Sequence, residues 1–323
     1  MRVLVTGATG FVGSRLVPEL IDAGHDVSVL VRDAADYDPP SGVRVFEGDV
    51  LEPGSFETAL ENCEAVYYLI HSMGGGGDFA ERDRRAARNV SRAASAAGVD
   101  RVIYLSGLGG DGELSEHLRS RREVEYVLGE GEFDLTALRA AVVIGAESAS
   151  FRMIRQLADR LPLMVTPEWV RTECQPIAVR DVVSYLVGVL DAPETAGGTY
   201  QVGGPEVLTY REMLEETARV LHGRTPLIVP VPVLTPTLSA YWVDLVTDVP
   251  ADVAHPLIDG LGNRVVVTDD SIEELVPVEL TTFEDAVRRA IDEEREDGTR
   301  PNHAAGSSDR GAVPIDDEGS GGA

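Results

Sequence analysis

A glycine motif directly after the first apolar run constrains the fold of this chain most strongly. The run Val3–Val5 leads into the sequence TGATGFVG at residues 6–13, which has the spacing TGxxGxxG. Apolar residues at helical spacing follow, and a second strand-like run covers Val27–Val31. Strand, glycines, helix and strand within about thirty residues are typical of a βαβ unit whose helix N-terminus binds a pyrophosphate.

Each glycine of this motif has its own expected role. Gly7 would allow a tight turn, Gly10 would let a phosphate approach the backbone, and Gly13 would let the helix pack closely on the sheet. The predicted dinucleotide contacts in this loop are Thr6, Gly7, Thr9, Gly10, Phe11, Val12 and Gly13. A glycine-rich turn without any ligand is the alternative.

Strand-like and helix-like segments alternate from residue 1 to about 200. The pattern predicts an α/β fold, with a doubly wound parallel sheet of Rossmann type and a smaller C-terminal lobe. The expected strands are Val3–Val5, Val27–Val31, Val43–Glu47, Ala65–Ile70, Val102–Leu105, Leu135–Leu138 and Tyr200–Val202. The expected helices are Gly13–Ala23, Ser55–Glu61, Phe79–Ala97 and Leu118–Leu128. Pro18 removes a backbone hydrogen bond from the first helix and should kink it.

After residue 204 the alternation loosens. We expect a dinucleotide-binding core over residues 1–204, with inserted lobe segments near 147–175, and a substrate lobe over 205–296. Residues 297–323 have few apolar side chains and should form a disordered acidic tail. Expected elements of the lobe are helices at Tyr210–Leu221 and Phe283–Glu294, a proline-rich stretch at 226–236 and a short strand at Val265–Val267.

Charge and composition exclude several classes of protein. The formal net charge is −27, and all 28 basic residues are arginine. Because no basic stripe is available for phosphates, nucleic-acid binding is not expected. The acidity is spread along the chain, which favours adaptation to high intracellular salt over a dedicated basic partner. No apolar run has transmembrane length and no signal peptide is evident, so we expect a cytoplasmic monomer or homodimer.

The two cysteines, Cys63 and Cys174, indicate neither a disulfide framework nor a metal site. We expect them to be ordinary thiols.

Several later motifs point to a family. They are Gly48–Val50, Tyr104–Gly107, Leu138–Arg139, Val143–Gly145, Pro176–Val182 and Tyr200–Gly204. With the glycine loop, their order and spacing resemble the short-chain dehydrogenase/reductase family in its extended and atypical forms. The nearest branch binds NAD(P)H and includes NmrA-like proteins and the 39-kDa accessory subunit of respiratory complex I.

The resemblance implies further cofactor contacts. Asp49 would accept a hydrogen bond from the adenine amino group, with Val50 against the ring, although Asp49 could instead cap a turn. Arg32 follows the second strand, where a guanidinium suits the 2′-phosphate of NADP(H). The adjacent Asp33 keeps NAD(H) possible. The residues expected beside the cofactor ribose are Leu69, Ile70 and His71.

The family's active members use Asn, Ser, Tyr and Lys, and this chain lacks the Tyr-x-x-x-Lys pair because it contains no lysine. Ser106 occupies the serine position and would orient a substrate. His117 stands for the tyrosine and Arg121 for the lysine, while Asp83 aligns with the asparagine. His117 would titrate near neutrality and serve as general acid. The alternative is a solvated, basic start to a helix.

The second lobe offers candidates for an apolar ligand pocket or for plain core. They are Met153, Leu157, Leu161, Met164, Trp169, Tyr241 and Trp242. Arg171 could face a substrate or form a surface ion pair.

These residues favour an oxidoreductase or isomerase that acts on a small or apolar substrate, with NADP(H) preferred and NAD(H) possible. The alternative is a non-catalytic dinucleotide-binding redox sensor or assembly factor. A sugar-nucleotide epimerase or dehydratase is a weaker third hypothesis, because those enzymes generally need the Tyr–Lys pair.

Overall fold

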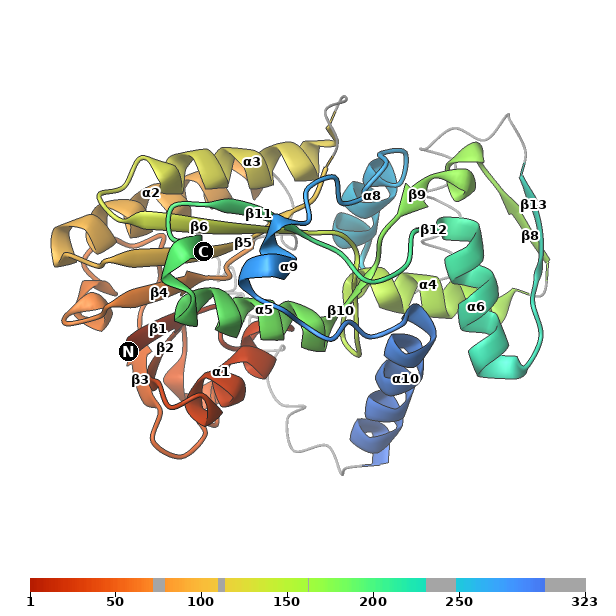
Figure 1. Ribbon diagram of the computed structural model, residues 1–323. Coiled ribbons are helices and arrows are strands. Elements are labelled where there is room, and N and C mark those ends of the chain that lie inside the picture. Colours follow the sequence, from red (N-terminus) through yellow and green to blue (C-terminus); the bar gives the residue numbers. More distant parts are fainter. Residues whose placement is uncertain (72–78, 110–113, 162, 231–247, 300–323) are drawn as a thin grey trace, which may run out of the picture.

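A seven-stranded parallel sheet forms one half of the molecule (Figure 1). The computed structural model describes residues 1–71, 79–109, 114–161, 163–230 and 248–299. The strand order is β11-β6-β5-β4-β1-β2-β3, and each neighbouring pair is parallel. The chain order reverses between β1 and β4, which is the position where open sheets of this kind bind ligands. The predicted doubly wound, Rossmann-type sheet is therefore confirmed.

Helices cover both faces of the sheet (Figure 1). Its strands are β1 (Arg2–Thr6), β2 (Asp26–Val31), β3 (Arg44–Glu47), β4 (Ala65–Tyr68), β5 (Arg101–Gly107), β6 (Asp134–Ala140) and β11 (Thr199–Val202). The helices α1 (Gly13–Asp22) and α5 (Val179–Asp191) lie on one face, and α2 (Phe79–Ala97) and α3 (Glu116–Gly129) lie on the other. Helix α1 continues past Pro18.

The strands read as unbroken apolar runs because both faces are buried. In β1, Val3 and Val5 pack in the cluster that contains the side chains of α1 and α5. Leu4 points to the opposite face, into the cluster with α2 and α3.

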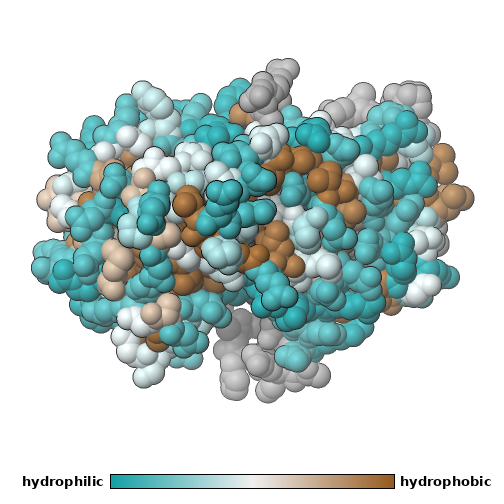
Figure 2. Space-filling model, viewed as in Figure 1, coloured by the Kyte–Doolittle hydropathy of each residue, from teal (hydrophilic) through white to brown (hydrophobic). Residues whose placement is uncertain are grey.

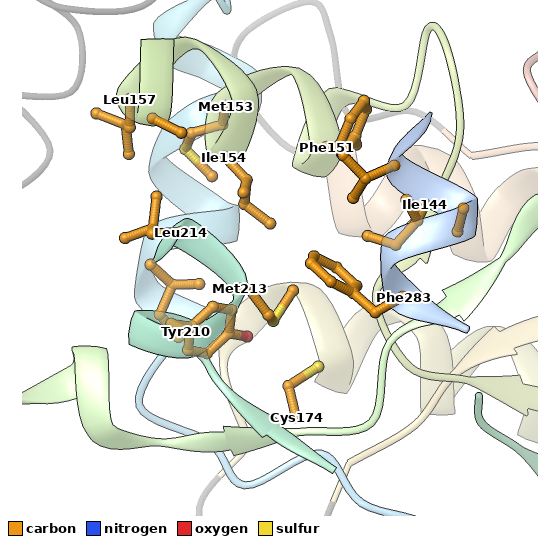
Figure 3. Packing of buried hydrophobic residues seen from close by; sticks show 14 of the residues in the cluster. Ile144, Phe151, Met153, Ile154, Leu157, Cys174, Tyr210, Met213, Leu214 and Phe283 are labelled. Atoms are coloured by element: carbon orange, nitrogen blue, oxygen red, sulfur yellow. The ribbon is translucent and has the colours of Figure 1, made fainter. Parts of the chain in front are cut away.

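The second half of the molecule is a smaller lobe beyond the carboxyl ends of the strands (Figure 1). Its helices are α4 (Ala149–Arg160), α6 (Tyr210–His222), α8 (Ala251–Gly260) and α10 (Phe283–Thr299). Its strand pairs are β7 (Val143–Ile144) with β10 (Ile177–Ala178), β9 (Glu173–Cys174) with β12 (Leu208–Thr209), and β8 (Leu163–Thr166) with β13 (Leu227–Pro230). Figure 3 shows the core of this lobe, where Phe151 of α4, Met213 of α6 and Phe283 of α10 are buried in one cluster.

Short turns connect these elements. The 3-10 turns are η1 (Ala34–Asp36), η2 (Glu57–Leu60), η3 (Glu168–Arg171) and η4 (Pro193–Thr195). Helix α9 (Ser271–Leu275) packs with the sheet side rather than with the lobe, because Ile272 and the following Val276 belong to the cluster of α1 and α5.

Some predicted elements differ from the structure. The helix expected at Ser55–Glu61 is the 3-10 turn η2. The strand expected at Val265–Val267 is a single bridge from Val265 to Cys174. The proline-rich stretch contains β13, and Pro230 sits at its end. Tyr241, Trp242 and residues 300–323 of the expected tail lie outside the described residues.

The surface view in Figure 2 is mainly hydrophilic, in keeping with the high acidic content. Apolar side chains gather at the edge formed by β8 and β13, where Leu163 is 55% and Leu227 62% exposed. No helix in the described part of the chain is long and apolar enough to cross a membrane.

Candidate functional site

A cavity of about 510 Å³ opens at the carboxyl ends of β1, β4, β5 and β6. The sheet side contributes the glycine loop after β1, with Leu69 after β4 and Ser106 in β5. The lobe contributes apolar side chains such as Ile154 of α4 and Leu257 of α8. The cavity therefore has one wall at the strand switch point and a second wall in the lobe.

The glycine loop has the close packing that its sequence predicts. Gly7 has φ of +72°, and a Cβ there would lie 2.9 Å from the carbonyl oxygen of Leu69. A Cβ on Gly13 would lie 2.2 Å from the carbonyl oxygen of Gly7. Only glycine fits these two positions, because a side chain would displace the backbone.

Gly10 is less crowded, since its Cβ would meet only the Gly7 carbonyl oxygen, at 3.2 Å. The amide N–H groups of Phe11, Val12 and Gly13 donate no hydrogen bond within the described part of the chain. No side chain caps the start of α1. Free amide groups at a helix N-terminus suit a phosphate, so the loop fits the pyrophosphate of a dinucleotide.

Arg15 holds the loop from its outer side. The guanidinium lies 4.8 Å from the centre of the Phe11 ring and donates to the carbonyl oxygen of Phe11. It also pairs with Glu147, before α4, at 3.3 Å and with Glu293, in α10, at 3.2 Å. One side chain of α1 therefore connects the loop to two distant parts of the lobe.

Some predicted cofactor contacts lie away from the cavity. The buried hydroxyl of Thr6 donates to the carbonyl oxygen of Tyr67 and links β1 to β4. Thr9 is exposed, and neither Ile70 nor the buried Val50 lines the cavity. One carboxylate oxygen of Asp49 accepts the Leu51 N–H at 2.8 Å, which is the turn-capping alternative.

Arg32 and Asp33, the two charged residues expected to set cofactor selectivity, follow the end of β2. Arg32 is exposed. Asp33 is the N-cap of η1, and its carboxylate accepts the Ala35 N–H at 2.9 Å. The carboxylate of Asp33 is thus already engaged by its own backbone, whereas Arg32 extends into solvent.

The structure brings the three predicted catalytic residues to one cavity wall. Ser106 ends β5, and both His117 and Arg121 lie on the first turns of α3. The Ser106 hydroxyl is buried and makes no hydrogen bond of ordinary geometry among the described residues, although it lies close enough to Tyr104 and Glu125 to oppose the rise in the pKa of each. Arg121 donates to the carbonyl oxygen of Leu105 and lies 5.4 Å from the centre of the Tyr104 ring.

His71 joins this group through a contact that the sequence did not predict. Its Nδ1 lies 2.9 Å from Oδ2 of Asp83, whose side chain is 3% exposed. The His71 ring also lies beside that of His117, with 4.9 Å between the ring centres. His71 and His117 both line the cavity.

Burial, together with His71 and Arg121 nearby, lowers the pKa of His117 to about 3. The expectation that His117 titrates near neutrality is therefore wrong, since its ring is neutral at pH 7. The pKa of His71 is also lowered, by burial and by Arg121, while the Asp83 carboxylate opposes that shift. Burial therefore makes both histidines harder to protonate than a histidine exposed to solvent.

Of the apolar candidates in the lobe, Met153 lines the cavity. Met164 is buried core, and Leu161 packs at its edge. Leu157 and Trp169 border a separate void of about 20 Å³ behind the cavity. Leu157, Leu161, Met164 and Trp169 therefore belong to the core of the lobe, which was the alternative to a ligand pocket.

Arg171, Cys63 and Cys174 were also considered in the sequence, and none of them lines the cavity. Arg171 is exposed and pairs with Glu168 at 3.3 Å, which is the surface alternative. Cys63 and Cys174 are free thiols, and burial raises the pKa of each to about 11. In the described ranges no group of His, Cys, Asp and Glu side chains could hold a metal ion.

Sequence reasoning missed most of the lobe wall. The additional lining residues include Val142, Ile154, Tyr210, Leu257 and Leu261. They come from five elements or loops separated along the chain, and no motif links them. A signal was available for Ile154, which lies three and seven residues before Leu157 and Leu161, a spacing typical of one face of a helix.

Comparison with known proteins agrees with this geometry. Residues 7–156 match the family model described as NAD(P)H-binding. A divinyl chlorophyllide a 8-vinyl-reductase of Oryza sativa subsp. indica is 27% identical over 263 residues, which cover 75% of this chain and 63% of that protein. The chain thus spans less than two thirds of that relative.

Two further relatives carry the names of an assembly factor and of a dehydrogenase subunit. A photosystem II assembly factor of Synechocystis sp. is 28% identical over 230 residues, or 68% of each chain. Subunit 9 of the NADH dehydrogenase 1 alpha subcomplex of Arabidopsis thaliana is 25% identical, over 83% of this chain and 70% of its own. The predicted resemblance to the atypical branch is confirmed.

Solved structures agree on the fold. A nucleoside-diphosphate-sugar epimerase of Staphylococcus aureus has a TM-score of 0.73 at 17% identity, over 89% of this chain and all of its own. A triphenylmethane reductase of Citrobacter sp., solved with NADP(H), has a TM-score of 0.72 at 20% identity, over 90% of this chain and all of its own. The matched residues 7–156 hold the glycine loop and the cluster of Ser106, His117 and Arg121, and they contribute most of the strands of the Rossmann-type sheet, so this part of the chain is similar to the NAD(P)H-binding family.

Proposed function

We propose that this protein is an NAD(P)H-dependent oxidoreductase that acts on a small, largely apolar substrate. The observation that carries the proposal is the single cavity in which the glycine loop faces the apolar lobe wall. Such a cavity can bring a dinucleotide and an apolar molecule together, away from bulk water.

In this proposal the loop amides of Phe11, Val12 and Gly13 bind the pyrophosphate. Leu69 and His71, after β4, lie beside the nicotinamide half. When bound, NAD(P)H supplies a hydride equivalent. Ser106 then orients the substrate oxygen, because it lines the cavity and its buried hydroxyl makes no hydrogen bond of ordinary geometry within the described residues.

Arg121 would hold the cofactor ribose or an anionic group of a ligand. Its guanidinium is fixed by the carbonyl oxygen of Leu105 and the ring of Tyr104. An arginine stays charged throughout a reaction, so its role is to bind and orient and not to transfer a proton.

The preference for NADP(H) rests on the end of β2. Arg32 is exposed there, and the Asp33 carboxylate is engaged by the Ala35 N–H. A guanidinium can form two charge-assisted hydrogen bonds to a 2′-phosphate. Only one oxygen of the Asp33 carboxylate accepts the Ala35 N–H, so the other oxygen keeps the ribose of NAD(H) as the alternative.

The lobe wall supports an apolar substrate over a sugar nucleotide. Ile154, Leu257 and Leu261 offer no hydrogen bonds, whereas the hydroxyl groups of a sugar lose free energy when they are buried without partners.

A non-catalytic role as a redox sensor or assembly factor is the second candidate. The chain contains no lysine, and the neutral His117 cannot donate a proton as an imidazolium at pH 7. Two relatives that carry the names of an assembly factor and a respiratory subunit also favour it.

Calorimetric titration of NADPH and NADH in concentrated KCl tests the cofactor assignment, and cofactor oxidation with carbonyl and quinone compounds then separates the two candidates. Turnover supports the oxidoreductase. Tight NADPH binding without turnover of any compound selects the non-catalytic role, and failure to bind either nucleotide contradicts both.

A further inference from the structure

Three buried groups from separate elements meet where the two cavity walls join. Asp83 comes from α2, His71 from the segment after β4, and His117 from α3. Asp83 contacts Nδ1 of His71 at 2.9 Å, and the two imidazole rings lie 4.9 Å apart. The side chains are therefore in sequence from a buried carboxylate to the cavity.

The four ring nitrogens can be assigned in turn. A carboxylate accepts hydrogen bonds, so Nδ1 of His71 carries a proton and donates it to Asp83. In the neutral ring, Nε2 of His71 is then an acceptor. This atom and Nδ1 of His117 are both buried without partners within the described chain.

Two unpartnered buried nitrogens on neighbouring rings are costly unless they satisfy each other. If Nδ1 of His117 carries a proton, it can donate it to Nε2 of His71. Nε2 of His117 is then left as the outer nitrogen of the chain, and it is not among the buried unpartnered atoms. Because His117 lines the cavity, this nitrogen can meet a ligand.

We propose that Asp83, His71 and His117 form a proton relay that exchanges a proton with a carbonyl or alcohol substrate in the cavity. His117 is the catalytic residue that touches the substrate, and His71 and Asp83 act through it. The inference rests on the proposed oxidoreductase function and supplies the proton transfer for which the Tyr–Lys pair is missing.

At rest both rings are neutral, with a proton on each Nδ1. Before a reduction, Nε2 of His117 takes a proton from water in the cavity, and Nδ1 of His117 passes its own proton to Nε2 of His71, which becomes imidazolium. As the carbonyl carbon receives a hydride, the electron pair of the C=O π bond moves to oxygen. That oxygen takes the proton from Nε2 of His117, and Nδ1 of His117 takes the proton from Nε2 of His71. One O–H bond has formed, and His71 has changed from imidazolium to neutral imidazole. Oxidation of the alcohol reverses each transfer.

The charges around the relay favour this division of roles. When the pair has taken up the extra proton, His71 carries the positive charge beside the Asp83 carboxylate, whereas His117 is neutral before and after the transfer to the substrate. The groups that face the pair are Asp83 from α2 and Arg121 from α3, in the part of the chain that the structure describes. Burial and Arg121 oppose a charge on either ring, and only His71 has a carboxylate in contact.

The first test is NMR of full-length protein with ¹⁵N-labelled histidine, with and without NADPH, and needs no substrate. Variants of His71 and His117 assign their signals among the six histidines. At pH 7 we expect both rings to be neutral with the proton on Nδ1. A proton on Nε2 of His71 at pH 7, or a His117 tautomer that does not change when His71 is replaced by Phe, which offers no acceptor, overturns the relay.

The second test compares two carboxylates that each contact a histidine. Asp83→Asn keeps an acceptor near His71 but removes the charge, so the pKa of His71 should fall. In a carbonyl reduction that the protein catalyses, kcat at pH 7 should fall about 100-fold, the pH profile should move to lower pH, and KM should stay the same.

Asp191→Asn is the matched control, because Asp191 contacts Nε2 of His25 at 3.4 Å, away from the cavity lining. It should change the titration of His25 and leave kcat unchanged. Turnover with an unaltered pH profile in Asp83→Asn contradicts the relay alone. Absence of turnover in the wild type, with NADPH bound, contradicts the proposed function as well. If Asp83→Asn does not fold, the tautomers of the wild type still decide.

Discussion

The two walls of the cavity are built differently along the chain. The sheet wall depends on one short stretch, Gly7–Gly13, whose backbone groups do the binding. The lobe wall collects single side chains from α4, α6, α8 and the loops between them. A backbone site needs a fixed pattern of glycines, whereas a wall of side chains needs only apolar residues of suitable size. The difference explains why one wall has a motif and the other has none.

Replacement of one glycine should break the sheet wall alone. Gly10→Val should weaken NADPH binding by at least about 100-fold, since a side chain there blocks the amides that hydrogen-bond the phosphates. The fold should persist, because the added Cβ meets only the Gly7 carbonyl oxygen, at 3.2 Å. Calorimetry measures the affinity and circular dichroism checks the fold. Gly129→Val is the control, as its Cβ would lie 3.7 Å from Leu135. Unchanged affinity in Gly10→Val would remove the cofactor assignment.

Low pH should destabilise the fold through His117, which lies where the two walls of the cavity meet. The folded pKa of His117 is about 3 and its ordinary value is 6.5, so the unfolded chain binds the extra proton between these pH values. Stability is then lost as the pH falls from 6.5 towards 3, by about 2 kcal/mol between pH 7 and pH 5 from this residue. His117→Gln should show a smaller loss than the wild type in denaturant unfolding at the two pH values. Equal losses would mean that His117 is not buried as described.

The edge of the sheet wall should decide between the two cofactors. Arg32→Glu should weaken NADPH binding about tenfold and change NADH binding little, because a contact to the 2′-phosphate would be lost. The effect should shrink as KCl is raised, since Arg32 is exposed. Asp33→Asn keeps the Ala35 cap and serves as the comparison. If Arg32→Glu leaves the preference for NADPH over NADH unchanged, Arg32 does not contact the 2′-phosphate.

A substitution in the lobe wall should have the smallest effect, and it should change only the KM of the substrate. Leu257→Ala should raise the KM of an apolar substrate about fivefold, because part of its buried surface loses contact. NADPH affinity should not change, as measured by calorimetry. Leu163→Ala on exposed β8 is the control. A loss of cofactor affinity in Leu257→Ala would show that the two walls are not separate.

The sequence predicts the sheet half well for a physical reason. Strands buried on both faces are continuous apolar runs, and helix α2 was predicted with its observed ends, Phe79 and Ala97. In the lobe, helices α6 and α10 were predicted from their first residues, Tyr210 and Phe283. Strands such as β7 and β9 were not predicted, because they have two residues each. Helices α4 and α8 pack against segments that are distant along the chain, and the periodicity of a sequence does not predict such contacts.

The candidate site divides in the same way. Ser106, His117 and Arg121 were predicted together because the family resemblance assigns them to the positions of its Ser, Tyr and Lys. The contact of His71 with Asp83 could not be predicted, since it depends on how α2 is rotated against β4. The low pKa of His117 follows from burial, which no local pattern specifies.

The three-way contact of Arg15 has a consequence for synthesis on the ribosome. The glycine loop leaves the exit tunnel among the first residues, but Arg15 can reach Glu147 and Glu293 only when almost the whole chain has emerged. At about 5–20 residues per second, the loop waits on the order of tens of seconds for its last support. A chain cut short before α10 would carry the complete motif and the Glu147 pair but lack the Glu293 contact, so the motif alone is a poor guide to function in fragments.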